Sequence, residues 1–331
     1  MCQYSSPDGF ATDWHMVHLG CRAVGGAAAV LTEAAAVTPD GRISPVDLGI
    51  YKDEHVEPLA RIFTFIEGQG AVPGMQLAHA GRKASTAPPW TGGGPVPPAD
   101  GGWEPICAPS AVAFREGWQV PRALTIHGIK DIVHAFAVAA GRVLEAGGKV
   151  IEIHAAHGYL LHEFLSPLSN HRADEYGGSF EHRTRIVREV VDAVRAVWPE
   201  RFPLFVRISA TDWVEGGWTI EDSVALAREL QQHGVDVIDC SSGGNVSHAQ
   251  IPVAAGYQVP FAERIRRDTG VKTAAVGLIT DARRAETILE QEQADLIVMA
   301  RQLLRDPYWP LHAAKELGDP VHPPVQYQRA F

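Results

Sequence analysis

The chain has 331 residues, of which 46% are hydrophobic, and a formal net charge of −10 at pH 7. Its length suffices for one large domain or two ordinary ones. The acidic charge disfavours nucleic acid and anionic membranes as main partners, because both attract basic surfaces. No apolar run reaches transmembrane length and residues 1–6 lack the features of a signal peptide, so we expect a cytoplasmic protein whose partner is a small molecule.

Seven short apolar runs alternate with helical patterns, which predicts repeated βα units around a parallel sheet. Polar or glycine-rich residues follow each run, as they do at the carboxyl ends of barrel strands. The predicted strands are 27–31, 72–77, 150–153, 204–208, 235–238, 273–276 and 296–299.

Closure of such a barrel takes eight strands, and the sequence supplies seven. The stretch Met1-Cys2-Gln3-Tyr4 is of the type found just after a strand, so we expect the first strand to precede Met1, through natural truncation or a misassigned start. The predicted fold is therefore an α/β (β/α)8 TIM barrel that lacks its N-terminal first strand, in a single domain over residues 1–331.

Helices are recognisable between the strands. From 181 to 198 the apolar residues recur at intervals of three and four, which predicts one buried face. Thr219-Ile-Glu-Asp222 has the form of a capping box at a helix start, and Thr280-Asp-Ala-Arg resembles another start. The apolar face predicted for the first of these helices comprises Ile186, Val190, Val194 and Val197.

Residues 85–128 interrupt this rhythm with a segment rich in proline and glycine. Such a segment within a compact domain is usually a functional lid or a disordered insertion. Two of its tryptophans, Trp90 and Trp103, favour a packed lid.

The four cysteines are widely spaced and form no CxxC pair, so the sequence indicates neither a disulfide framework nor a structural zinc site. We expect reduced thiols. They are Cys2, Cys21, Cys107 and Cys240.

The motif His154-Ala-Ala-His157-Gly-Tyr159 follows a predicted buried strand. Two imidazole N–H groups at one strand end can hold a single oxygen or anionic group of a substrate, and a phenol can donate a proton to a strongly basic carbanion. Two alternatives remain. The histidines could ligate a metal together with a carboxylate such as Glu152, although HExxH spacing is absent, or they could make only local hydrogen bonds.

Arg207 lies in an otherwise apolar predicted strand. A buried cation is costly unless a carboxylate or a bound anion faces it. An internal salt bridge to Glu33 or Glu152 is the alternative to a ligand.

The last two predicted strands are followed by Gly277 and by Ala300-Arg301. Many barrels bind phosphate at these positions, through backbone N–H groups and a short extra helix. Residues 302–305 would supply that helix.

Several sequence blocks spread over nearly the whole chain together resemble the Old Yellow Enzyme family of flavin-dependent ene-reductases, in particular its short bacterial NADPH dehydrogenases. The longest block runs from His154 to Ser179. The other blocks are Met1 to Tyr4, Gln76 to Lys83, Asp239 to Gly243, Arg301 to Pro307 and Pro324 to Arg329.

The resemblance implies a barrel that holds non-covalent FMN at the carboxyl ends of its strands, with NADPH or NADH as reductant. It implies that Cys2 modulates the potential of the flavin and that Arg207 stabilises the negative charge of its reduced form. By matching position, the residues around the flavin would be Met1, Cys2, Ala34, Gln76, Arg207, Gly277, Ala300 and Arg301.

The reaction that the resemblance implies is reduction of activated C=C bonds in α,β-unsaturated carbonyl or nitro compounds. His154 and His157 would bind the substrate oxygen, Tyr159 would donate the proton, and Tyr4 would help to position the substrate. In this subgroup an arginine near the C-terminus reaches a neighbouring subunit's site, which implies that Arg329 binds substrate in a homo-oligomer, a dimer or tetramer. The alternatives are a metal-dependent barrel hydrolase and, because of the missing strand, an inactive flavin-binding homologue.

Overall fold

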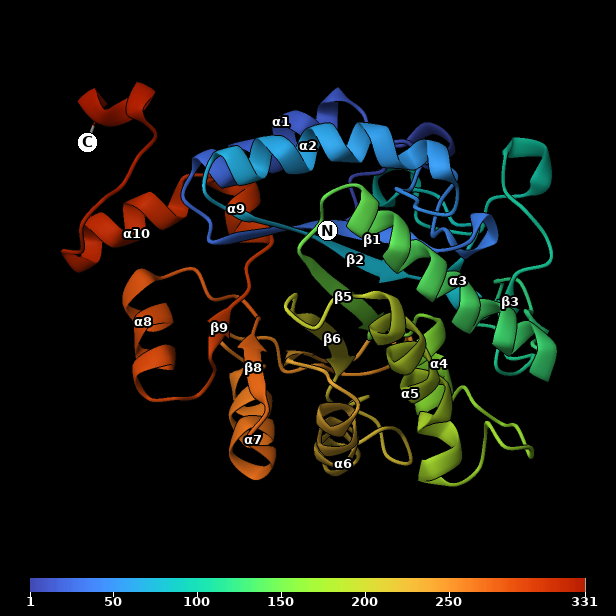
Figure 1. Cartoon of the computed structure of the whole chain (residues 1–331). Coiled ribbons are helices and arrows are strands. Elements are labelled where there is room, and N and C mark those ends of the chain that lie inside the picture. The colour runs from blue at the N-terminus through green and yellow to red at the C-terminus, as the bar shows by residue number, and fades with distance from the viewer. Residues whose placement is uncertain (331) are drawn as a thin grey trace.

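A computed structural model describes residues 1–330 and shows a curled sheet of seven parallel strands whose neighbours follow chain order (Figure 1). All seven predicted strands are present, and β1 and β9 are the edges of the sheet within the described residues. Within residues 1–330, the fold therefore matches seven strands of the predicted barrel. The strands are β1 (Ala29–Ala36), β2 (Val72–Ala78), β5 (Val150–Ala155), β6 (Leu204–Ser209), β7 (Val237–Ser241), β8 (Lys272–Ala275) and β9 (Leu296–Ile297).

Some strand bounds differ from the predicted ones. The first strand extends to Ala36, beyond the predicted end at Leu31, because Ala34, Ala35 and Ala36 continue the ladder without bulky apolar side chains that would mark a strand in the sequence. At the other edge, β9 is only two residues long. An edge strand has one neighbour instead of two, so fewer ladder hydrogen bonds hold it.

Helices cover the outer face of the sheet (Figure 1), and no described helix is both long and apolar enough to cross a membrane. They are α1 (Asp13–Val24), α2 (Val56–Gly68), α3 (Ile126–Glu145), α4 (Leu160–Leu165), α5 (Phe180–Val197), α6 (Ile220–Gln232), α7 (Val259–Thr269), α8 (Ala282–Glu290), α9 (Arg301–Arg305) and α10 (Trp309–Leu317). Short 3-10 turns at Pro7–Gly9, Pro39–Gly41, Asp53–His55, Gly81–Lys83, Pro89–Thr91, Pro98–Asp100 and Val325–Ala330 complete the described elements.

The predicted apolar face of α5 is buried at Ile186, Val190 and Val194. Burial of a side chain of this size contributes about 1.5–3 kcal/mol. The prediction is wrong for Val197, which is 44% exposed because it is the last residue of the helix.

Capping confirms the predicted helix starts. At α6, Thr219 Oγ1 accepts from Asp222 N, and the Asp222 carboxylate accepts from Thr219 N at 3.0 Å, which is the predicted capping box. At α8 the cap is Asp281, whose carboxylate accepts from Arg284 N at 2.8 Å.

The proline- and glycine-rich segment is a packed excursion beside β3 (Cys107–Ala108), which pairs with β4 (Arg122–Ala123) (Figure 1). The Trp103 indole donates to the Asp40 backbone oxygen at 3.1 Å. The Trp90 ring packs edge-on against Tyr4, with centroids 5.3 Å apart. The segment therefore touches the N-terminal residues, as a lid over that end of the sheet would.

Candidate active site

The predicted histidine pair and phenol come together at the end of β5. The His154 ring centroid lies 5.1 Å from that of His157 and 5.2 Å from that of Tyr159, both edge-on. His157 adopts φ +60, a left-handed conformation that is uncommon for a residue with a side chain and that turns its imidazole back toward His154.

Hydrogen bonds orient the two imidazoles. Nδ1 of His157 lies 3.4 Å from Nε2 of His154, and Nε2 of His157 lies 2.6 Å from the Ser241 hydroxyl at the end of β7. Donation from the Ser241 hydroxyl to Nε2 would leave the ring proton of His157 on Nδ1, facing His154. Burial, then the nearby charge of Arg207, keeps the pKa of both histidines well below the ordinary value, so both rings are neutral at pH 7.

A buried chain of hydrogen bonds fixes the turn that carries His157 and Tyr159. The backbone N–H of Gly158 donates to Nδ1 of His162 at 2.8 Å. Nε2 of His162 lies 3.0 Å from a carboxylate oxygen of Asp212, and both side chains are fully buried. Sequence reasoning missed Asp212, because its contact with His162 bridges 50 residues of chain.

Tyr159 and Asp47 line the same small cavity, whose volume is about 10 Å³. Burial raises the pKa of Tyr159 well above its ordinary value, and the thiol of Cys2 raises it further. Burial also raises the pKa of Tyr4 and, most strongly, that of the Cys2 thiol. These three side chains therefore all carry their protons at neutral pH.

A row of polar side chains crosses the inner face of the sheet. Nε2 of Gln76 donates to Glu152 at 2.5 Å, and Nε of Arg207 lies 3.3 Å from Asp239. Burial and the neighbouring Asp239 raise the pKa of Glu152 to about 8, so it is largely protonated at neutral pH. The carboxylate facing Arg207 is thus Asp239, neither of the two predicted; Glu33 instead contacts His15 at 3.3 Å.

Apart from Met1 and Cys2, the residues expected around the flavin lie on the strands or in the segments that follow them. Ala34 pairs with Gln76 in the β1–β2 register, and the Met1 ammonium is close enough to lower the pKa of His154. On the other side, Gly277 follows β8 with φ +129, where a Cβ would come within 3.1 Å of a side-chain nitrogen. Ala300 precedes α9, whose first residue is the exposed Arg301, and α9 is the predicted short helix.

These residues fit FMN by their chemistry. The side chain of Arg207 is 19% exposed, and with its Nε turned toward Asp239 its guanidinium can offer the remaining N–H groups to an acceptor on an electron-rich ring. In the same row of polar side chains, the Gln76 amide donates to Glu152. The turn at Gly277 and the side chain of Arg301 suit a phosphate.

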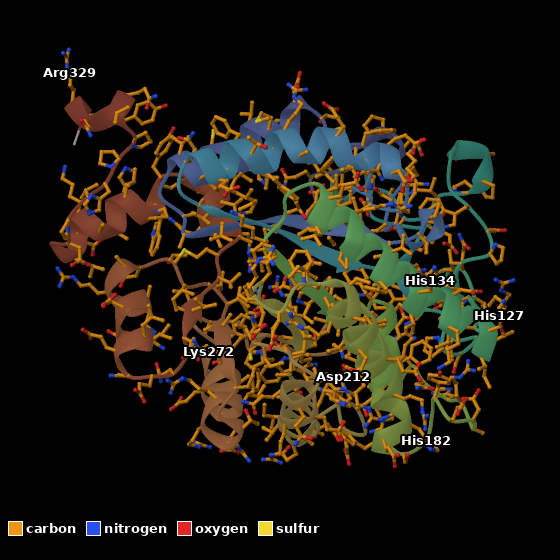
Figure 2. All side chains as sticks on the ribbon, viewed as in Figure 1. His127, His134, His182, Asp212, Lys272 and Arg329 are labelled. Carbon is orange, nitrogen blue, oxygen red and sulfur yellow. The ribbon has the colours of Figure 1, made fainter. Side chains whose placement is uncertain are left out.

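Arg329 does not join this cluster within the chain. It is exposed in the last turn of the C-terminal tail, at the far edge of the molecule from the sheet (Figure 2). A contact with substrate would have to be made in another subunit.

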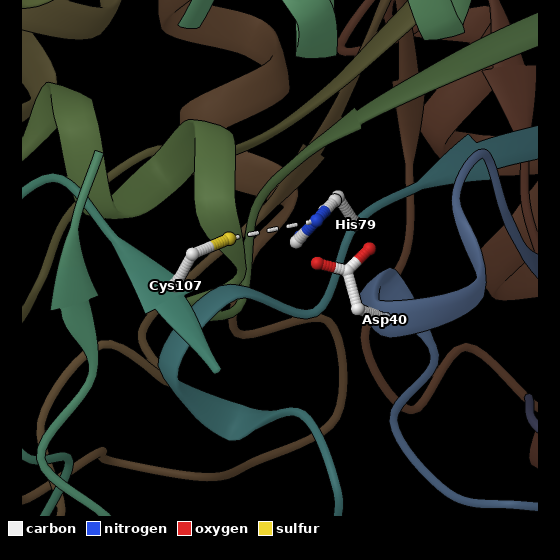
Figure 3. A group of neighbouring side chains, drawn as sticks. All are labelled: Asp40, His79 and Cys107. Atoms are coloured by element: carbon white, nitrogen blue, oxygen red, sulfur yellow. Dashed lines mark hydrogen bonds between the residues drawn. The ribbon is translucent and has the colours of Figure 1, made fainter. Parts of the chain in front are cut away.

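The metal alternative is not favoured at the histidine pair. Among residues 1–330, the side chains with ligand spacing are Asp40, His79 and Cys107, with Nε2 of His79 3.7 Å from Sγ of Cys107 (Figure 3). The Gly81 backbone N–H donates to Nδ1 of His79 at 3.1 Å, so Nε2 carries the ring proton and faces the sulfur. This group is therefore an N–H···S contact, since a metal needs the lone pair on Nε2.

The site therefore combines two imidazoles that can bind an oxygen, a phenol that can donate a proton and a guanidinium that can face a planar ring. This is the arrangement of a flavin-dependent oxidoreductase built on a barrel. The model of the NADH:flavin oxidoreductase / NADH oxidase family matches residues 1–319, and the chain belongs to this family. FMN is accordingly its cofactor and NAD(P)H its reductant.

Relatives agree with this assignment. The chain is 49% identical over 333 aligned residues to an NADPH dehydrogenase of Bacillus subtilis, covering 100% of this chain and 93% of the relative. It is 48% identical to an NADPH dehydrogenase of Geobacillus thermodenitrificans, with 100% and 92% covered. Among solved structures, a morphinone reductase superimposes with a TM-score of 0.78 at 26% identity, covering 98% of this chain and 86% of the other. The resemblance to the Old Yellow Enzyme family is confirmed.

Proposed function

We propose that the enzyme reduces the activated C=C bond of α,β-unsaturated carbonyl or nitro compounds, with His154 and His157 as the oxygen-binding pair. One observation carries the proposal. The two facing ring nitrogens lie 3.4 Å apart, so a single oxygen placed to one side of the pair is within hydrogen-bond reach, about 2.8–3.0 Å, of both.

The protein's part in this reaction is to polarise and orient the substrate. Bound FMN supplies hydride transfer from NAD(P)H to the substrate. N–H groups of two neutral imidazoles stabilise the negative charge that grows on the substrate oxygen, and this makes Cβ electrophilic. Arg207 balances negative charge on the reduced cofactor, while Asp239 holds its guanidinium in place.

Tyr159 is the proton donor to Cα in this proposal. Its raised pKa keeps the phenol protonated through the neutral range, and its ring is held against His154 beside the oxygen pair. Tyr4 closes the substrate side, where Trp90 of the inserted segment packs against it.

The proposal extends to assembly. Arg329 is exposed and far from its own site, so its contact with substrate requires a neighbouring subunit and therefore a homo-oligomer. Size-exclusion chromatography with light scattering tests this part, and a monomer with full activity would contradict it.

The activity is tested by NADPH oxidation with 2-cyclohexen-1-one and with 1-nitrocyclohexene, each measured with the FMN-loaded enzyme. We expect consumption of both. His154→Ala and His157→Ala should each weaken phenol and enone binding while the flavin stays bound. Release of flavin from either variant, or unchanged phenol binding in both, would show that the pair does not hold the substrate oxygen.

A further inference from the structure

Lys83 lies beside the histidine pair and has no part in the steps above. Its Nζ donates to the backbone oxygen of His157 at 2.8 Å and to that of Gly244. The same nitrogen lies 4.3 Å from the centre of the Phe114 ring and 5.5 Å from that of Tyr159. An ammonium group has three N–H donors, so two carbonyl contacts leave one donor available.

The side chain of Lys83 lies against two residues that the proposed function assigns to the substrate, since its Nζ donates to the His157 backbone oxygen and faces the Tyr159 ring. Lys83, His157 and Tyr159 are each only partly buried, whereas the residues of β5 behind them are fully buried. The amine therefore borders the position proposed for the substrate.

The charge of this amine is balanced by dipoles and aromatic rings, since no carboxylate pairs with it within residues 1–330. Arg82 and Glu163 are its charged neighbours. Burial, opposed by Glu163 and assisted by Arg82, lowers the pKa of Lys83 to about 7. A partly buried ammonium group without a counter-ion is stabilised by an anion that binds beside it, because folding has already removed much of its hydration.

We propose that Lys83 binds a carboxylate on the substrate while His154 and His157 hold the carbonyl oxygen, so that the enzyme prefers unsaturated carbonyl compounds that carry a second, anionic group. This inference rests on the proposed function. It assigns Lys83 to specificity, and the inserted segment contributes to it through Phe114, whose ring faces the amine.

The test uses one carbon skeleton in two charge states, 3-oxocyclohex-1-ene-1-carboxylate and its methyl ester. The measured quantity is the ratio of kcat/KM for the acid to that for the ester, in the wild type, Lys83→Gln and Lys83→Arg. Glutamine keeps N–H donors for the two backbone oxygens but removes the charge. We expect the ratio to fall about tenfold in Lys83→Gln and to be largely kept in Lys83→Arg.

The pH dependence gives a second readout. The ratio for the wild type should fall between about pH 6 and about pH 8.5, because kcat/KM follows the free enzyme and the free amine loses its proton near 7. For Lys83→Arg the ratio should stay flat, because a guanidinium keeps its charge over this range.

An unchanged ratio in Lys83→Gln overturns the inference. So does an equal loss for acid and ester, which would mean that Lys83 only positions the His157 backbone. Calorimetric titration of the oxidised holoenzyme with both compounds measures binding without turnover. Equal affinity of the wild type for acid and ester overturns the inference. Tighter binding of the acid that is lost in Lys83→Gln supports it. Binding of both without reduction of either would contradict the proposed function alone.

Discussion

The middle of the sheet and its β8–β9 edge hold their polar groups in different ways. At the ends of β5 to β7, the side chains of the candidate active site are held by buried partners, as His157 is by Ser241 and Arg207 by Asp239. At the edge, β9 has two residues, Leu296 is 40% exposed, and the side chain of Arg301 lies in solvent. A strand with two neighbours can preorganise its side chains, whereas an edge leaves them to be ordered by what they bind.

The largest effect is expected from breaking the buried chain under the turn at His157. In Asp212→Ala, the donors from His162, from the Ser166 hydroxyl at 2.5 Å and from Trp218 N at 2.9 Å all lose their acceptor. Buried donors without partners cost about 1–3 kcal/mol each, so we expect a loss of roughly 3–5 kcal/mol. Denaturant unfolding of the variant measures it.

The matched control is Asp192→Ala, which removes the acceptor of an exposed His–Asp pair with His233. Surface pairs of this kind contribute about 0–1 kcal/mol. Similar losses in the two variants would mean that the turn at His157 does not depend on the buried pair.

Two arginine variants compare the middle with the edge directly. Arg207→Met should weaken FMN binding and also destabilise the protein, because the buried Asp239 loses the cation that faces it. Arg301→Met should weaken FMN binding by about tenfold or more without a stability cost, because Arg301 is exposed and no hydrogen bond of its side chain is recorded within residues 1–330. Fluorescence titration with FMN and apoprotein unfolding separate the two effects. A loss of stability in the Arg301→Met apoprotein would contradict the proposed difference between the middle of the sheet and its edge.

Ser241→Ala tests how the oxygen pair is oriented. Without the hydroxyl, Nε2 of His157 loses its 2.6 Å partner and the ring proton is no longer confined to Nδ1. We expect phenol and enone binding to weaken about tenfold with flavin affinity unchanged, read from the flavin spectrum on titration. Undiminished phenol affinity would show that the ring does not need this partner.

The smallest expected effect is a change in the pH dependence of stability, caused by burial of the Glu163 carboxyl. Burial raises the pKa of Glu163 to about 8, although Arg82 N donates to it at 2.8 Å. The folded state therefore holds this proton more tightly than the unfolded chain, and its contribution to stability is lost as pH rises from about 4.5 to about 8. Relative to the wild type, Glu163→Gln should become more stable by about 1 kcal/mol or more as the pH rises from 5 to 8, measured in unfolding experiments. A constant difference between the two proteins would contradict this.

The sequence predicts the strands and the main cluster because both depend on local patterns. Apolar runs mark all seven strands, and the carboxyl ends of parallel strands meet at one side of a sheet, which brings His154 and Arg207 into register. Register itself is not visible in a single sequence. Asp239 was therefore missed as the partner of Arg207, although the two lie directly opposite each other on β6 and β7.

Contacts that depend on long loops were missed for the same reason. Lys83 reaches His157 across 74 residues, and Ser241 reaches it across 84. Neither residue stands out in the sequence, because a serine or lysine after a strand is ordinary turn chemistry until the fold shows what it faces.

The edge-on packing of Trp90 against Tyr4 gives the protein an internal optical reporter. Trp90 is 69% exposed, whereas Trp198 and Trp218 are almost fully buried. Emission from the buried indoles should follow unfolding of the whole domain, while that from Trp90 should respond to a ligand that enters beside Tyr4. Comparison with Trp90→Phe would isolate the second signal, so that occupancy of the site and integrity of the barrel can be followed in one sample.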